Sequence, residues 1–205
     1  ILHASLAPNS SNLQLWEFYH VTSKKLMKKI SYACFNQPAA RTASQFVAVV
    51  TRKDLWNKRR LFNLSKIKAR NLKLNDKHLK NRSIAIKYYK YLIPTVYREF
   101  YGILGLFRYF NVLIIGLFRP IYRQVTKSDM RVVAHKSSAL AAQNFMLSMR
   151  SNGYDTCPME GFDSLRVKKT LSLPRSAEIN MIISCGIRDE KGIYGDQIRV
   201  TFEEI

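Results

Sequence analysis

Two short apolar runs constrain the fold of this chain more than any other feature. They are "ASQFVAVVT" at residues 43–51 and "INMIISCGI" at residues 179–187. Each run is rich in β-branched side chains and lacks a polar alternation, which is typical of a strand buried on both faces. Residues 137–155, "SSALAAQNFMLSMRSNGYD", predict a long helix that ends at Gly153 in the left-handed region.

The remaining elements predict a mixture of helices and strands without a regular strand–helix–strand alternation. Apolar residues at helical spacing begin the chain and stop at Pro8, "LWEFYHV" at residues 15–21 predicts a strand, and "TSKKLMKKI" predicts a helix that starts at Thr22 or Ser23. Residues 52–100 predict helices with a loop around residues 71–76. We therefore expect an α+β fold instead of a doubly wound parallel sheet.

Length and composition fit one domain that covers residues 1–205. The chain has 205 residues, 47% of them hydrophobic, which is enough for one substantial core. It begins as if in mid-helix, so we expect an N-terminally incomplete domain. The widely spaced Cys34, Cys157 and Cys185 fit buried thiols in a reducing, cytoplasmic setting. The four histidines lack paired spacing, so we expect no metal.

The charge of the chain is concentrated in one segment. The net charge is +20, and residues 52–136 hold 21 of the 34 basic residues but only four acids. This composition step marks a basic helical excursion at about residues 52–136. Basic residues interleaved with Tyr and Phe favour a nucleic-acid or anionic-membrane binding module as one hypothesis. No recognisable nucleic-acid motif accompanies them, so we expect nucleic acid not to be a partner.

An apolar run, "YGILGLFRYFNVLIIGLF" at residues 101–118, raises the question of membrane contact. A membrane span needs about 20 mostly apolar residues, and Arg108 and Asn111 interrupt this one. Three alternatives remain open: a span, an amphipathic helix at the membrane interface, and a buried or lid-forming helix. Peripheral membrane contact through residues 101–119 follows from the second.

Common catalytic motifs are missing from the sequence. It contains no G-x-G-x-x-G, no phosphate-binding G-x-x-x-x-G-K-[ST] and no G-x-S-x-G. The acidic residues are sparse and spread out, so a pair of catalytic carboxylates has no support. If the chain is an enzyme, an organic cofactor is expected to carry the chemistry.

Four segments, in order along the chain, resemble the FMN-dependent nitroreductase family. They are "LAPNSSNLQLWEF", "CFNQPAARTASQFVAVV", "AAQNFMLSMRSNGYDTCPMEGFD" and "CGIRDEKGIYGDQIRVTFEEI". The similarity covers about the first 50 and the last 75 residues. It implies a mixed, mainly antiparallel sheet flanked by helices in an intertwined homodimer with two FMN sites. The basic excursion falls where this family has a variable helical segment over the active site.

The resemblance also implies which residues hold the flavin. A polar loop matched by Pro8, Asn9, Ser10 and Asn12 is expected to contact FMN from the partner subunit. An amide next to the ring's pyrimidine edge and a helix position beside the ring are matched by Asn36 and Ser137. Short polar groups and amides of this kind suit hydrogen bonds to a flavin.

The turn "PMEG" and the C-terminal tail complete the implied site. The family's turn places backbone against the ring, with an N–H directed at flavin N5; it is matched by Pro158, Met159, Glu160 and Gly161. In the tail, Arg199 matches a phosphate-binding arginine, and Gln197 stands where the family usually has lysine. Asn9, Leu15 and Thr201 also depart from the family's motifs.

The resemblance implies an enzyme whose cofactors are FMN and, as electron donor, NADH or NADPH. The expected reaction is reduction of a small-molecule electron acceptor, such as a nitroaromatic or a quinone, by ping-pong hydride transfer. Tyr97, Tyr101 or Phe107 of the excursion are candidates for lining the acceptor pocket. The alternatives are the basic binding module and a flavin-binding family member without nitroreductase turnover.

Overall fold

A four-stranded sheet forms the centre of the molecule. The computed structural model describes residues 1–69, 76–192 and 195–205. The strand order is β1 (Trp16–Val21), β2 (Gln45–Thr51), β4 (Glu178–Gly186) and β3 (Asp155–Met159), and each neighbouring pair is antiparallel. The α+β class is confirmed. The loop predicted around residues 71–76 falls almost wholly outside the described residues.

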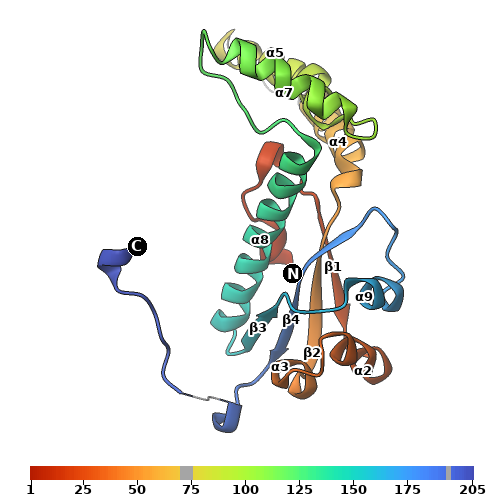
Figure 1. Cartoon of the computed structure of the whole chain (residues 1–205), viewed down its shortest axis with the longest axis vertical. Coiled ribbons are helices and arrows are strands. Elements are labelled where there is room, and N and C mark those ends of the chain that lie inside the picture. The colour runs from red at the N-terminus through yellow and green to blue at the C-terminus, as the bar shows by residue number, and fades with distance from the viewer. Residues whose placement is uncertain (70–75, 193–194) are drawn as a thin grey trace.

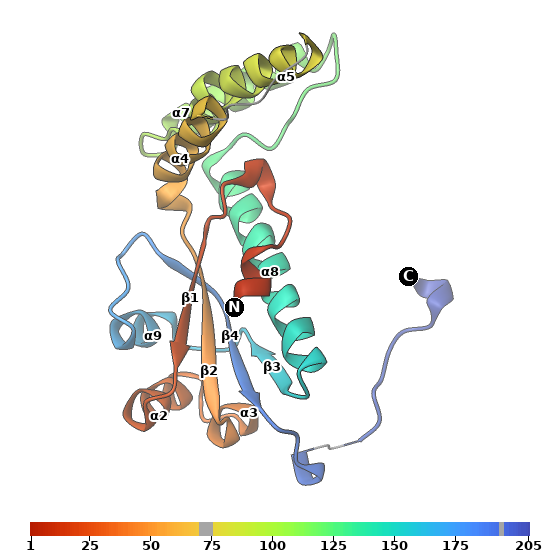
Figure 2. The same ribbon diagram turned by 180° about the vertical axis from the view of Figure 1, so that it is seen from behind.

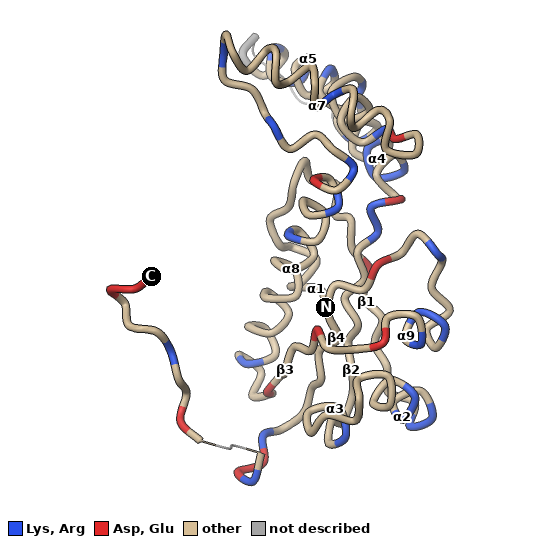
Figure 3. Tube along the Cα trace, in the orientation of Figure 1, with Lys and Arg blue, Asp and Glu red and all other residues tan. Residues whose placement is uncertain are grey.

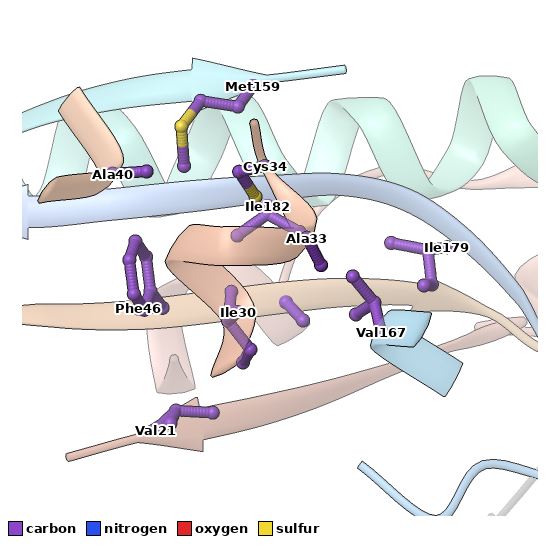
Figure 4. Close-up of a cluster of buried hydrophobic side chains, with 11 residues drawn as sticks. Val21, Ile30, Ala33, Cys34, Ala40, Phe46, Met159, Val167, Ile179 and Ile182 are labelled. Carbon is purple, nitrogen blue, oxygen red and sulfur yellow. The ribbon is translucent and has the colours of Figure 1, made fainter. Parts of the chain in front are cut away.

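Both faces of the central strands are buried, as the two apolar runs predict. In β2, Phe46 and Ala48 belong to one core cluster, whereas Val47 and Val49 belong to the cluster on the opposite face. In β4 the same alternation puts Ile182 in the first cluster, which Figure 4 shows in detail. A strand with apolar side chains at every position is stable only between two covering layers.

Helices supply those two layers (Figure 1). One face is covered by α2 (Lys24–Ala33), α3 (Pro38–Thr42) and α9 (Ser164–Thr170), which contribute side chains to the first cluster. The other face is covered by α1 (Leu2–Ser5) and α8 (Lys127–Ser151). We refer to the sheet and these helices as the body.

Helix α8 starts earlier than the sequence predicts. Thr126 caps it, because its hydroxyl accepts from the backbone N–H of Asp129 while the Asp129 carboxylate accepts from the N–H of Thr126. This reciprocal pair satisfies two N–H groups of the first turn. The helix ends before Gly153, whose φ is +81° as predicted. Residues 127–136 therefore belong to the body, and the excursion comprises residues 52–126.

The excursion packs against one end of α8 and of the sheet, remote from α2 and α3 (Figures 1 and 2). Its described elements surround a small core of their own, which includes Leu64, Tyr89, Ile93 and Tyr97 and extends to Leu13. They are η2 (Lys53–Leu55), α4 (Trp56–Ala69), α5 (Asp76–Lys87), the π-helical η3 (Tyr88–Leu92), α6 (Ile93–Tyr97) and α7 (Ile103–Ile115).

The C-terminal residues leave the body. After η4 (Glu190–Gly192), residues 195–205 run outward as an exposed tail that ends in η5 (Phe202–Glu204) (Figure 1). Of the three cysteines, Cys34 and Cys185 are buried as expected. The prediction is wrong for Cys157, which is exposed because it lies on the edge strand β3. Within the described ranges, no helix combines the length and apolarity that crossing a membrane requires.

Candidate functional site

The polar loop after α1 has a fixed and unusual backbone. Ser11, Asn12 and Gln14 all have positive φ values, of 56°, 49° and 48°. The side chain of Asn9 stabilises this shape: its Nδ2 donates to the Ala7 carbonyl at 3.2 Å, and its Oδ1 accepts from the Gln14 N–H at 2.8 Å. Non-glycine residues in the left-handed region need such support. The Asn9 amide is therefore occupied within the loop.

Three side chains of the excursion hold the same loop. The Tyr89 hydroxyl donates to the Ser11 carbonyl at 2.8 Å, and Asn63 Nδ2 donates to the Asn12 carbonyl at 2.7 Å. The Tyr88 hydroxyl and Ser11 Oγ are 2.6 Å apart. Sequence reasoning missed these residues, because their partners lie 51 to 78 positions away and no local pattern marks them. The excursion thus adds three contacts to those that Asn9 makes within the loop.

Two of the predicted site residues meet where this loop crosses α8. The Ser10 N–H donates to Ser137 Oγ at 3.2 Å, and the Ser137 hydroxyl donates to the Val133 carbonyl at 3.1 Å. Ser137 is buried, with 7% exposure. Its hydroxyl fastens the loop to the helix, while Pro8 and Asn12 flank the fastened point. We call residues 8–12 together with Ser137 the loop group.

A second group of predicted residues lies apart from the loop group, beside α2 and α3. Asn36 follows α2 with φ +50° and is exposed, and Ser31 Oγ lies 3.4 Å from its Oδ1. The neighbouring Gln37 donates from Nε2 to the Gly161 carbonyl at 3.1 Å. This bond connects the residues after α2 with the turn after β3. We call Asn36 and residues 158–161 the turn group.

The turn itself exposes backbone to solvent. Pro158, Glu160 and Gly161 are exposed, whereas the Met159 side chain is buried in the core with 3% exposure. Met159 can therefore serve a ligand only through its backbone. Apart from its two neighbours in the chain, a Cβ built on Gly161 would meet no atom of the described residues within 4 Å. This open surface leaves room for a flat ring to lie against the peptide groups of the turn.

The described part of one chain does not bring the predicted residues into a single site. The loop group lies beside the excursion, whereas the turn group follows β3, whose last residue Met159 pairs with Ile182 in the middle of β4 (Figure 1). Gln197 and Arg199 lie on the exposed tail, where the Arg199 guanidinium donates to the carbonyl of Ile198 at 2.7 Å. Three separate parts therefore carry the predicted residues.

A cavity of about 650 Å³ adjoins the loop group. Ser10 and Ser11 line it from the loop, and Tyr97 and Phe107 line it from the excursion. Two of the aromatic candidates for an acceptor pocket therefore do line a cavity. Tyr101 is not among the lining residues and is almost fully exposed.

Comparison with known proteins identifies the family. The sequence profile of the Nitroreductase family matches residues 1–187, and the chain belongs to this family. YdgI of Bacillus subtilis, which is named as an NAD(P)H nitroreductase, is 27% identical over 191 residues, covering 92% of this chain and 75% of YdgI.

Solved structures show the same fold. The Bacillus subtilis protein YdfN matches with a TM-score of 0.69 at 21% identity, over 99% of this chain and 82% of YdfN. A nitroreductase from Exiguobacterium sibiricum, solved in complex with FMN, matches with a TM-score of 0.62 at 20% identity, over 99% of this chain and 80% of that chain. The nitroreductase fold expected from the resemblance is confirmed.

Proposed function

We propose that this chain is an FMN-dependent oxidoreductase that uses NADH or NADPH to reduce an electron-poor acceptor, such as a nitroaromatic or a quinone, by a ping-pong mechanism. One observation carries the proposal: the exposed backbone of the turn group, with open space at Gly161, stands beside the exposed amide of Asn36. Membership of the Nitroreductase family supports the same function.

The turn group fits a flavin ring. The Asn36 amide can donate to and accept from the pyrimidine edge, and the backbone of Pro158–Gly161 offers an N–H for N5 without a titrating side chain. Bound there, FMN would accept hydride from the nicotinamide and pass it to the acceptor. Gly161 keeps the approach to the ring free of a side chain. Glu160, although exposed, contributes through its peptide group.

The separation of the two groups supports an intertwined homodimer. The loop group is fastened to α8 on one face of the sheet and the turn group adjoins the helices of the other face, so a site that contains both is best built from two chains. Residues 8–12 and Ser137 of one protomer would then complete the ring site of its partner. A site between subunits also limits access of water to the ring.

The tail supports the same arrangement. Side chains alternate between two sides along an extended chain, so Ile198 and Val200 are expected on one side of the tail and Gln197 and Arg199 on the other, and Phe202 follows in η5. The three apolar residues are exposed, Ile198 and Phe202 at 88% each. We infer that the apolar side docks on the body of the partner and that the polar side faces the FMN phosphate, where the guanidinium of Arg199 suits phosphate oxygens.

The test combines cofactor binding with turnover. The purified protein titrated with FMN should develop the flavin absorbance spectrum, which NADH or NADPH should bleach and a quinone should restore. Asn36→Ala should weaken FMN binding about tenfold, because one hydrogen bond to the ring is lost. Asn81→Ala, at an exposed position of α5, is the matched control and should bind FMN as the wild type does.

The same experiment separates the alternatives. Bleaching by NADH or NADPH without recovery by any acceptor would favour a flavin-binding family member without turnover. A protein that stays colourless and binds DNA or liposomes with a steep salt dependence would favour the basic binding module. Some basic residues of the excursion have structural partners: Arg60, for example, donates to the Tyr89 carbonyl at 3.0 Å.

A further inference from the structure

The cavity beside the loop group has the size and lining of a binding site for an apolar molecule. Its volume of about 650 Å³ falls in the range of pockets that hold small organic ligands. Most of the lining residues are apolar, among them Leu92, Ile93, Val96, Val112 and Val133. A molecule with an aliphatic or prenyl body would therefore fit better than a charged one.

One polar group in the cavity wall has no partner. The hydroxyl of Tyr97 is buried and makes no hydrogen bond with any described residue, and the side chain is 6% exposed. Burial raises its pKa to about 12, so it remains a neutral O–H donor. The Ser10 side chain counters part of this rise but does not form a hydrogen bond of acceptable geometry with it. A buried donor without an acceptor points to a ligand oxygen.

Helix α7 forms one wall of the cavity and exposes most of its large apolar residues to solvent. Phe107 and Val112 of α7 line the cavity, whereas much of the remaining helix surface faces solvent. The exposed apolar residues of α7 and the segment after it are Ile103, Leu106, Phe107, Tyr109, Phe110, Leu113, Ile114, Leu117 and Phe118, and Phe118 is 84% exposed. Contiguous exposed apolar surface of this kind marks an interaction site.

The one basic side chain within α7 turns inward. Arg108 donates to the Arg98 carbonyl at 2.8 Å and to the Val125 carbonyl at 2.9 Å, and it pairs with the carboxylate of Glu99. Gly105 lets α7 lie close to the start of α8, since a Cβ at this position would be only 3.0 Å from the backbone nitrogen of Lys127. The outward face of α7 is therefore held in place by contacts on its inward face.

The charges that flank the exposed face of α7 indicate what kind of surface it binds. Arg98 precedes α7, Arg119 and Arg123 follow it, and all three are exposed, whereas the nearby Glu99 is occupied by Arg108. Figure 3 shows more basic than acidic segments along the excursion. A second copy of the same surface would oppose these like charges. An anionic lipid surface complements them and accepts the apolar side chains between them. With 13 residues, α7 is about 20 Å long and can lie on a bilayer but not cross it.

We propose that α7 rests on an anionic bilayer and that the cavity behind it takes up a lipid-soluble acceptor whose conjugated carbonyl accepts from the Tyr97 hydroxyl. This rests on the proposed function. A quinone or a long-chain enone has the required chemistry. One hydride, which carries both electrons, comes from NADH or NADPH and one proton comes from water, giving the hydroquinone or the saturated carbonyl compound and NAD⁺ or NADP⁺.

The docking claim is tested with vesicles. The full chain should sediment with vesicles that contain phosphatidylglycerol and not with vesicles of phosphatidylcholine alone. Leu117→Gln with Phe118→Gln should weaken this binding at least about tenfold, because two apolar side chains no longer enter the lipid. Leu165→Gln with Ile187→Gln, two equally exposed positions on the body, is the control and should leave binding unchanged.

The cavity claim is tested with acceptors. Tyr97→Phe should raise the KM for a prenylated quinone or a long-chain enone in vesicles about tenfold, because the hydrogen bond to the carbonyl is lost, and it should leave the binding of FMN unchanged. Separate assays with the prenylated quinone and with the long-chain enone identify which of them is reduced. If neither is reduced, the proposal that the cavity binds a lipid-soluble acceptor is wrong.

Other outcomes would refute the docking of α7 on an anionic bilayer and leave the proposed oxidoreductase function unaffected. Wild-type protein that reduces soluble benzoquinone but ignores anionic vesicles would refute docking on lipid. A change of oligomeric state in the Leu117→Gln, Phe118→Gln variant would assign the face to a second copy of the chain. Failure to bind FMN would instead refute the proposed function.

Discussion

The body and the excursion differ in how they place their apolar residues: the body buries them, whereas helix α7 of the excursion exposes many of them. In the body, the apolar runs of β2 and β4 lie between two helical layers and are almost wholly buried. In the excursion, α7 consists mostly of apolar residues, yet most of its large side chains are exposed. The body buries its apolar side chains, whereas α7 leaves most of its own exposed.

The largest expected effect concerns the contact that keeps α7 in place. Arg108→Ala should destabilise α7 locally by about 3–5 kcal/mol, because it leaves the partly buried Glu99 without its partner. Hydrogen exchange of residues 98–126 should accelerate while that of the body is unchanged. Arg119→Ala, at an exposed position, is the control. Equal protection of α7 in both variants would show that other contacts hold the helix.

Truncating a buried residue of the body should lower stability much more than truncating an exposed residue of the excursion. Ile182→Ala should lower the free energy of unfolding by about 2–5 kcal/mol, because it opens a cavity in the cluster that Figure 4 shows. Leu117→Ala in the excursion should change it by no more than about 0.5 kcal/mol. Denaturant unfolding measures both. Similar losses would mean that the exposed face of α7 is covered in solution.

Loss of the hydrogen bond between Asn63 of the excursion and the loop group should have an intermediate effect on stability. Asn63→Ala leaves the Asn12 carbonyl without its donor and should cost about 1–3 kcal/mol of stability. Because the loop group is proposed to contact the flavin of the partner, FMN binding should weaken as well. The exposed Asn81→Ala serves again as the control. Weaker stability with unchanged FMN affinity would separate the loop from the flavin site.

The smallest effect is expected for a single hydroxyl. Tyr88→Phe removes the 2.6 Å contact with Ser11 Oγ and keeps the ring, so it should cost about 0.5–1.5 kcal/mol. Thermal unfolding with and without FMN measures the loss. An unchanged melting temperature would indicate that water replaces the tyrosine hydroxyl.

Sequence reasoning predicted the body well because its signals are local. The runs at residues 43–51 and 179–187 require cover on both faces, and Gly153 marks the end of α8 through its own backbone conformation. The start of α8 was missed, since the capping pair of Thr126 and Asp129 lies within a basic, polar stretch. Family motifs then indicated which loops carry the candidate site.

The excursion and the details of the site could not be predicted in the same way. Periodicity shows that the run around Arg108 is apolar, but it does not show whether protein, lipid or solvent covers the outer face. Asn9 has the chemistry of a ligand contact, yet its amide is used within the loop. Tyr88 and Tyr89 support that loop from distant positions, so only the folded chain reveals their role.

The most direct test of a flavin site shared between two chains is complementation. Ser10→Trp should block the loop group and Gly161→Phe should fill the open space of the turn group, so neither homodimer should bind FMN. A purified heterodimer of the two variants keeps one intact loop group opposite one intact turn group, and a shared site predicts that it binds one FMN. A heterodimer that binds none, while the wild type binds two, would contradict a site built from both chains.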